Sequence, residues 1–254
     1  MYYKYLDEFF ARGEDMPKSM VIEMRRGDVT GDNVYDRVML VGSKPHGSNS
    51  PFVNNMYVVV FDSKTKRYIR IPLKNNAGYN PRLFLGDFTG DKILDIWVNM
   101  DSGASGGSGF YDLFTYEGYE FKSIFNNDIF NKRARFKVDF MDNYVVRVYG
   151  GNNEKSYLID IRDKEPEYLN KIYNPDGKLK EKKSGNVTPL NRAYPIDFDN
   201  NGVYDIYAIQ RITGIDDSDE IGFVNNILRW DDSFFEDFIE TVSIFGSNLG
   251  VEDK

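Results

Sequence analysis

Short apolar stretches alternate with polar turns along nearly the whole chain. The stretches are four or five residues long and rich in β-branched and aromatic side chains, as in VIEM (21–24), RVMLV (37–41), IWVNM (96–100) and IYAI (206–209). Runs of this length bounded by Gly, Asn and Asp are typical of β-strands. No run approaches the 18 apolar residues of a transmembrane helix. The pattern predicts an all-β protein.

Four segments consist of an apolar run, a polar turn and a second apolar run. They are MYVVVFDSKTKRYIRI (56–71), LFTYEGYEFKSIF (113–125), YLIDIRDKEPEYL (157–169) and NILRWDDSFFEDFI (226–239). Each follows a pair of shorter strands, so four units of four strands account for about residues 18–245. Four-stranded units repeated at this spacing are typical of propeller blades. We therefore expect a single β-propeller domain over residues 18–254 with four blades, and five as the alternative.

Two segments fall outside this repeat. The N-terminal tail, 1–17, is expected to form at most a short helix that ends at Gly13 and Pro17. The turn-rich, basic segment 171–190 is predicted to be a loop insertion that is either exposed to solvent or bound to a partner. In a five-bladed propeller, the termini and this insertion would supply the extra strands.

Three nine-residue segments align without gaps. They are DVTGDNVYD (28–36), DFTGDKILD (87–95) and DFDNNGVYD (197–205). A fourth, degenerate copy begins at Asp139 and lacks the later acids. Apolar stretches lie on both sides of each copy, so each is expected to form a loop between two strands.

The loops place oxygen-bearing side chains at positions 1, 3, 5 and 9, and a backbone carbonyl at position 7. Such a set suits a hard cation, usually calcium. The candidate ligands are Asp28, Thr30, Asp32, Val34 and Asp36 in the first loop, Asp87, Thr89, Asp91, Ile93 and Asp95 in the second, and Asp197, Asp199, Asn201, Val203 and Asp205 in the third. Two or three structural Ca²⁺ ions are expected. The alternative is that these are ordinary Asp-rich turns.

An EF-hand is excluded by position 12 of each loop. That position requires a bidentate Glu, and here it is Met39, Val98 and Ala208. The flanking segments are also strands and not helices. The loops, together with NNAGYNP (75–81) and DSGASGGSG (101–109), instead resemble FG-GAP/VCBS repeats of integrin-α-type β-propellers. They are also similar to VCBS-repeat proteins of spore-forming Bacillus-type bacteria. The resemblance implies a propeller with structural calcium in the blade hairpins.

The amino-acid composition and charge exclude several kinds of metal site and one class of binding partner. The chain has no cysteine and one histidine, which excludes thiolate metal sites and multi-histidine sites. A net charge of −8 lacks the basic footprint of a nucleic-acid-binding protein. The N-terminus does not read as a signal peptide. The chain is therefore expected in the cytoplasm, or at the extracellular, cell or spore surface if a leader was removed.

Three connectors without ion-loop character, 42–55, 101–109 and 212–222, are expected at one end of the propeller. A shared ligand surface would include Pro45, His46, Ser102, Gly106 and Asp216. The alternative is that the three connectors are unrelated, mobile loops. The expected function is a monomeric, calcium-binding and non-enzymatic scaffold that binds a protein or glycan partner. The alternative is a carbohydrate-active enzyme or lectin, whose acids would come from Asp101, Asp216, Asp217, Asp219 and Glu220.

Overall fold

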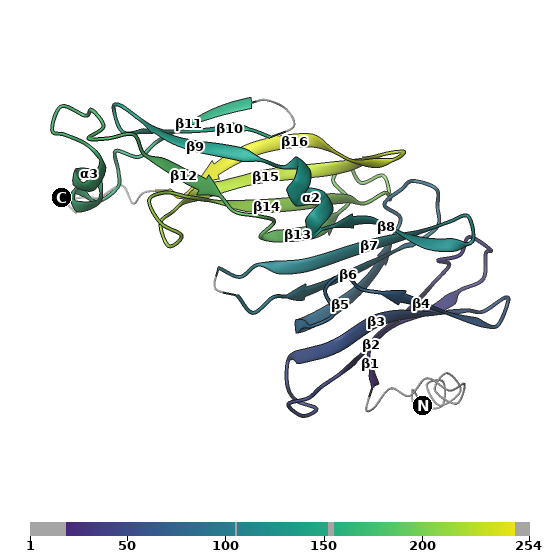
Figure 1. Cartoon of the computed structure of the whole chain (residues 1–254). Helices are drawn as coiled ribbons and strands as arrows, with labels where there is room; N and C mark the ends of the chain where they lie inside the picture. The colour runs from purple at the N-terminus through teal and green to yellow at the C-terminus, as the bar shows by residue number, and fades with distance from the viewer. Residues whose placement is uncertain (1–18, 105, 152–154, 247–254) are drawn as a thin grey trace, which may run out of the picture. The chain divides into compact units, whose positions relative to one another are not determined.

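The computed structural model describes residues 19–104, 106–151 and 155–246, and the expected N-terminal tail lies outside them. Within these residues the chain forms sixteen strands and two short helices, and its contacts divide it into two compact units (Figure 1). The first unit comprises Met1–Ile129, Arg192–Ile206 and Arg229–Glu236, and the second comprises Phe130–Asn191, Tyr207–Leu228 and Asp237–Lys254. The all-β class is confirmed.

Two antiparallel meanders of four strands form most of the first unit. The first consists of β1 (Met20–Gly27), β2 (Asp36–Ser43), β3 (Phe52–Asp62) and β4 (Arg67–Pro72). The second consists of β5 (Gly78–Gly86), β6 (Asp95–Asp101), β7 (Gly109–Glu117) and β8 (Glu120–Asn126). They join into one eight-stranded sheet through two residue pairs between β3 and β5, Phe52 with Tyr79 and Val53 with Gly78.

The core of the first unit draws side chains from both meanders. Alternate residues of β2, such as Val38 and Leu40, and of β6, such as Ile96 and Val98, are fully buried in one apolar cluster. The period of two in these strands places the intervening residues on the opposite face. There the Trp97 ring stacks between Phe88 and Phe125.

The second eight-stranded sheet has the order β11-β10-β9-β12-β14-β15-β16, with β13 paired to β14. Its strands are β9 (Phe136–Met141), β10 (Val145–Gly150), β11 (Lys155–Asp160), β12 (Ser184–Val187), β13 (Arg192–Ile196), β14 (Asp205–Thr213), β15 (Glu220–Asp231) and β16 (Phe234–Ile244). The helices are α2 (Asn127–Arg133) and α3 (Pro166–Ile172). The core of the second unit is an apolar cluster that includes Val146, Val148, Ile212 and Val224.

Two details differ from the repeat read in the sequence. The second half of YLIDIRDKEPEYL is helix α3 and not a strand, because Pro166 occupies the start of the helix, where its missing N–H costs nothing. The segment 171–190 contains strand β12, which pairs with both β9 and β14. The strands are grouped into two eight-stranded sheets, and the first two predicted four-stranded units each form half of the first sheet. No helix in the described part of the chain has the length and apolar character needed to cross a membrane.

Candidate functional site

The three acidic loops pack against one another in a row within the first unit. The Leu94 amide of the second loop donates to the Asp28 carbonyl of the first (3.0 Å), and the Tyr204 amide of the third donates to the Asp87 carbonyl of the second (2.7 Å). Gly27 leaves no Cβ to meet the Leu94 side chain at the first contact, and Gly86 leaves none to meet the Tyr204 ring at the second. The repeated motif thus forms one continuous structure of three loops, which we call the loop row.

The first end of the loop row is open to solvent. Val34 and Tyr35 occupy positions 7 and 8 of the first loop, and their side chains are 38% and 74% exposed. The corresponding Ile93 of the second loop packs on Gly31. The position-7 side chain of the second loop therefore contacts the preceding loop.

Hydrogen bonds within the first loop occupy most of its carboxylate oxygens. Asp28 accepts from the amides of Gly31 (2.8 Å) and Asn33 (2.7 Å). The buried Asp36 accepts from the Thr30 hydroxyl (3.0 Å) and, across the sheet, from the Ser63 amide (2.9 Å). Burial raises the pKa of Asp36, and the Ser63 amide opposes that rise. Most carboxylate oxygens of the first loop therefore already have hydrogen-bond donors from the protein itself.

The second loop has the same backbone bonds but leaves two buried oxygens unused. Asp87 accepts from the amides of Gly90 (2.6 Å) and Lys92 (2.9 Å), and Asp95 Oδ2 accepts from the Phe88 amide (2.7 Å). Thr89 Oγ1 and Asp95 Oδ1 are buried and make no hydrogen bond, in contrast to their counterparts in the first loop.

The electrostatics of the second loop follow from that burial. Asp95 is 1% exposed, and burial is the main cause that raises its pKa to about 7. Hydrogen bonds from the Thr115 side chain and the Phe88 amide oppose the rise, and the carboxylates of Asp91 and Asp87 contribute to it. The loop therefore holds negative charge that its own donors compensate only in part.

The third loop contains a cation supplied by the chain. The Arg229 guanidinium donates to both oxygens of Asp205, at 3.0 and 2.9 Å, and to Asp199 at 3.1 Å. Asp197 accepts from the amides of Asn201 and Gly202 and so shapes the turn. Arg229 lies outside the nine-residue motif, which is why sequence reasoning did not include it.

The remaining ligand candidates accept hydrogen bonds that stabilise the turns of their own loops. The position-5 side chains of Asp32, Asp91 and Asn201 accept from the amide two residues later, at 2.9, 2.8 and 2.7 Å. These Asx-type turns satisfy the loop backbone. Among the residues that the structure describes, no three Asp, Glu or His side chains converge as a ready-made metal cage.

The degenerate fourth copy forms no such loop. Asp139 lies within β9 and accepts from the hydroxyls of Tyr149 (2.9 Å) and Ser184 (3.0 Å). The first of these bonds is the main cause of a lowered pKa for Asp139. Its role is to tie β9 to its neighbours.

Part of the predicted ligand surface is brought together in the first unit. The His46 ring lies 5.6 Å from Phe52, Phe52 lies 5.1 Å from Tyr79, and Tyr79 packs on Gly103 in the glycine-rich connector. These contacts link connectors 42–55 and 101–109.

The other predicted members of that surface have local roles. The Ser102 hydroxyl donates to the Ser108 carbonyl (2.8 Å), and Gly106 has a positive φ of 89°. Pro45 lies in the exposed turn beside His46. Asp216 belongs to the second unit, where it accepts from the amide of Ser218 (2.9 Å).

Acids outside the loops are engaged with neighbouring groups. Asp101 is paired with Arg192 (2.9 Å), and Glu220 is paired with Arg211. The Asp219 side chain is only 9% exposed and accepts from Tyr168 Oη at 2.6 Å. This bond could not be predicted from a local pattern, because Tyr168 lies 51 positions away in the sequence.

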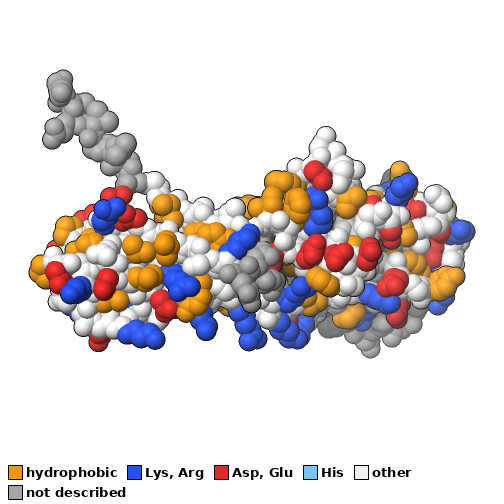
Figure 2. Space-filling model, turned by 90° about the horizontal axis from the view of Figure 1, so that it is seen from above, with side chains coloured by type: hydrophobic (Ala, Val, Ile, Leu, Met, Phe, Trp, Pro, Cys, Tyr) orange, Lys and Arg blue, Asp and Glu red, His pale blue; other side chains and the backbone are white. Residues whose placement is uncertain are grey.

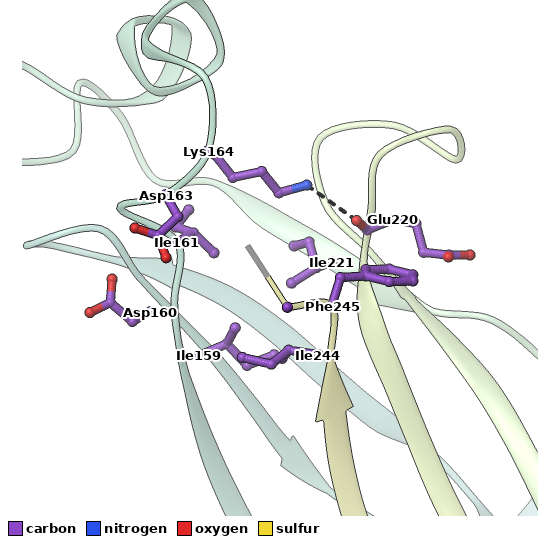
Figure 3. Close-up of a pocket in the computed structure, with 10 residues that line it drawn as sticks. Ile159, Asp160, Ile161, Asp163, Lys164, Glu220, Ile221, Ile244 and Phe245 are labelled. Carbon is purple, nitrogen blue, oxygen red and sulfur yellow. Dashed lines mark hydrogen bonds between the residues drawn. The ribbon is translucent and has the colours of Figure 1, made fainter. Parts of the chain in front are cut away.

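A small cavity of about 280 Å³ lies in the second unit, where the ends of β11 and β16 come near one another (Figure 3). Its apolar wall consists of Ile159, Ile161, Ile221, Ile244 and Phe245. At its rim Lys164 Nζ donates to the Glu220 carbonyl (3.2 Å), and the Asp160 carboxylate is paired with Arg162. Of the candidate residues named from the sequence, Glu220 alone lines this cavity.

Basic, acidic and hydrophobic side chains are interspersed on the face of the molecule that Figure 2 shows. Neither sign of charge gathers there into one continuous patch. Recognition at this surface would therefore depend on local grooves and not on a long-range field.

Comparison with known proteins identifies the family. A model described as the YybI C-terminal domain matches residues 134–243. The chain is 44% identical over 229 residues to YybI of Bacillus subtilis (strain 168), which covers 90% of this chain and 87% of the relative. No solved structure matches the chain. These matches overturn the resemblance to FG-GAP/VCBS repeats, which rested on a short loop motif that any Asp-rich strand–loop–strand unit can share. The chain belongs to the YybI family.

Proposed function

We propose that this protein is a non-enzymatic binding scaffold of β-meanders whose second acidic loop takes up a structural calcium ion. The observation that carries the proposal is the pair of unused, buried oxygens, Thr89 Oγ1 and Asp95 Oδ1. Buried polar atoms are nearly always satisfied, so an unsatisfied pair in one loop points to a missing partner. A cation with oxygen ligands would satisfy both and offset the charge of Asp87 and Asp91.

The other two loops support this assignment by contrast. In the first loop Thr30 Oγ1 donates to Asp36 Oδ2 and Asp36 Oδ1 accepts from the Ser63 amide, and in the third loop Arg229 supplies the positive charge. We therefore expect the second loop to bind first and the first loop more weakly. The third loop should not bind while Arg229 is present.

A calcium ion bound in the second loop would stabilise the folded state. The second loop lies between its two neighbours in the loop row and contacts both. A bound ion would fix the second loop and so keep the four-stranded meanders in register. The surface connectors around His46, Phe52 and Tyr79 would then remain available for partners.

Thermal unfolding in millimolar CaCl₂ and in EDTA tests the proposal. A ligand that binds only the folded state stabilises it by about 2.7 kcal/mol at 100 times its Kd. The wild type should melt higher in calcium, and Asp95→Asn should remove most of that rise. Asp139→Asn is the matched control and should leave the calcium response unchanged. Equal melting midpoints of the wild type in calcium and in EDTA would exclude the ion site.

A further inference from the structure

The contact between neighbouring acidic loops is made twice in the loop row, in the same way. The position-8 amide of the second loop, that of Leu94, donates to the position-1 carbonyl of Asp28 at 3.0 Å. The position-8 amide of the third loop, that of Tyr204, donates to the position-1 carbonyl of Asp87 at 2.7 Å. The repeated contact shows what a further loop would need in order to join the row.

A glycine immediately before the contacted loop is the first requirement. A Cβ at Gly27 would lie 2.5 Å from Leu94 Cδ1. A Cβ at Gly86 would lie 2.8 Å from Tyr204 Cδ2. Packed carbon atoms are about 3.5–4.0 Å apart, so any other residue at these two positions would push the position-8 side chain of the next loop away.

The first end of the loop row presents the unused half of this contact. Val34 and Tyr35, at positions 7 and 8, are 38% and 74% exposed, whereas positions 7 and 8 of the other two loops are half-buried. Among the described residues, the Tyr35 N–H has no hydrogen-bond acceptor. Tyrosine is enriched at protein contact surfaces. The first end therefore has the donor and the side chains with which one loop of this type docks on another.

The opposite end of the loop row differs from the required surface at one residue. The third loop is preceded by Ile196, where the other two loops are preceded by glycine. Its position 4 is Asn200, whose φ of 58° is left-handed, like that of the glycines at position 4 of the other loops. A side chain is tolerated there below a valine, because a Cβ at Gly90 would lie 3.9 Å from Val203 Cγ2. Ile196 is therefore the residue that opposes docking of the first end of one copy on the third loop of another.

We propose that the first end of the loop row is a docking site for a partner chain that presents an Asp-rich loop preceded by glycine, of the strand–loop–strand type that this chain itself contains. The Tyr35 N–H donates to the position-1 carbonyl of the partner loop, the Tyr35 ring covers the glycine before it, and Val34 packs on its position 4. Ile196 keeps copies of this chain from occupying the site. The contact uses backbone and apolar groups, so the inference goes beyond the calcium site and does not depend on it.

Two substitutions turn the chain into its own partner for a test. Ile196→Gly supplies the glycine before the third loop, and Val34→Asp removes the apolar contact at the first end. The double variant therefore presents only a completed third loop, and the wild type presents only a first end. Sedimentation velocity at up to about 1 mM should show a 1:1 complex in their mixture and monomers in each protein alone, since one small interface gives a weak complex.

Two further variants are the matched controls. Ile196→Ala combined with Val34→Asp loses nearly as much packing but keeps the Cβ, so its mixture with the wild type should contain monomers only. Ile196→Gly alone carries both ends and should form oligomers that grow with concentration, because a head-to-tail contact that does not close continues. Melting midpoints check the folding of each variant, and every mixture is measured in CaCl₂ and in EDTA.

A peptide probe tests the same site without a change in the third loop. The probe is a cyclic peptide with the sequence of residues 85–96, and its control has alanine at the position of Gly86. Titration into the ¹⁵N-labelled wild type should shift the Tyr35 amide resonance. Val34→Asp in the protein and alanine in the peptide should each weaken binding at least about tenfold, because each removes or blocks one part of the contact.

Four results would overturn the proposal. The first is the absence of a complex from mixtures of folded proteins together with an unshifted Tyr35 resonance. The second is equal complex formation by the Ile196→Gly and Ile196→Ala double variants. The third is a complex that forms only in CaCl₂, which would assign the contact to an ion that bridges two acidic loops. The fourth is a dimer of the wild type alone that Val34→Asp abolishes, because two first ends would then bind each other.

Discussion

The Arg229 guanidinium and the Asp205 carboxylate form a two-bonded ion pair, with Nε to Oδ1 at 3.0 Å and Nη2 to Oδ2 at 2.9 Å. Asp205 is the last acid of the third loop, and its side chain is 4% exposed. The last acid of this loop is therefore bonded to a side-chain cation, whereas Asp36 and Asp95, its counterparts, accept from backbone amides. The pair is the clearest difference among three loops with one sequence pattern.

Replacing Arg229 should therefore affect both stability and ion binding. Arg229→Gln leaves Asp205 buried without its partner, and we expect a loss of about 2–3 kcal/mol in the free energy of unfolding in EDTA. Calcium should restore part of this loss, and native mass spectrometry should detect one more bound ion than in the wild type. Arg162→Gln, which breaks an exposed ion pair, is the control and should cost less than about 1 kcal/mol. An unchanged ion count in Arg229→Gln would contradict the substitution of a side chain for an ion.

Packing between the first two loops can be isolated with two glycines. Gly31 and Gly118 have similar positive φ angles, 72° and 62°, but a Cβ at Gly31 would lie 2.5 Å from Ile93 Cδ1, whereas a Cβ at Gly118 would meet nothing within 4 Å. Both Ala variants should lose about 1 kcal/mol from backbone strain. Gly31→Ala should lose about 1 kcal/mol more through overpacking. Equal losses in urea unfolding would show that the loop contact is not tightly packed.

Asp112 should make stability depend on pH. It is 1% exposed; burial raises its pKa to about 7, and the Lys74 backbone amide opposes the rise. The folded state therefore holds a proton that the unfolded state releases near pH 4, so stability falls as pH rises from about 4 to about 7. The upper bound of this loss is on the order of 4 kcal/mol.

Asp112→Asn should reduce that fall, as measured by urea unfolding at pH 5 and pH 8. Asp160→Asn provides the opposite sign, because Arg162 holds the pKa of Asp160 below its usual value. The stability that Asp160 contributes is present above pH 4 and is lost as pH falls below it. A pH profile of Asp112→Asn identical to that of the wild type would show that Asp112 is ionised without penalty.

In the second unit, the bond from Tyr168 to Asp219 should be worth more than a neutral one. Tyr168 Oη donates to a nearly buried carboxylate that Lys164 also contacts at 3.3 Å. Tyr168→Phe should cost about 1.5–3 kcal/mol, the range for bonds to charged groups, and Tyr207→Phe, whose acceptor is the Asn225 amide oxygen, about 0.5–1.5 kcal/mol. Chemical denaturation of both variants measures the difference. A cost for Tyr168→Phe no greater than that for Tyr207→Phe would show that Asp219 does not depend on this hydroxyl.

The sequence predicted the local structure better than its assembly. Strand-forming runs and the loops between them follow from short-range patterns, as in β5 and β6 on either side of Asp87–Asp95. The turn from strand to helix at Pro166 was missed because an apolar run of that length fits either element. The partners of Asp205 and Asp219 come from residues 24 and 51 positions away, and no local pattern reports them.

The loop row also has a direction. Each later loop contacts the one before it: Leu94 of the second loop contacts the first loop, and Tyr204 of the third contacts the second. The equivalent residue of the first loop, Tyr35, has an exposed side chain and contacts no further loop among the described residues. In such a one-dimensional array, stability is shared between nearest neighbours. A disturbance in the middle loop therefore reaches both others, whereas one in either end loop reaches a single neighbour.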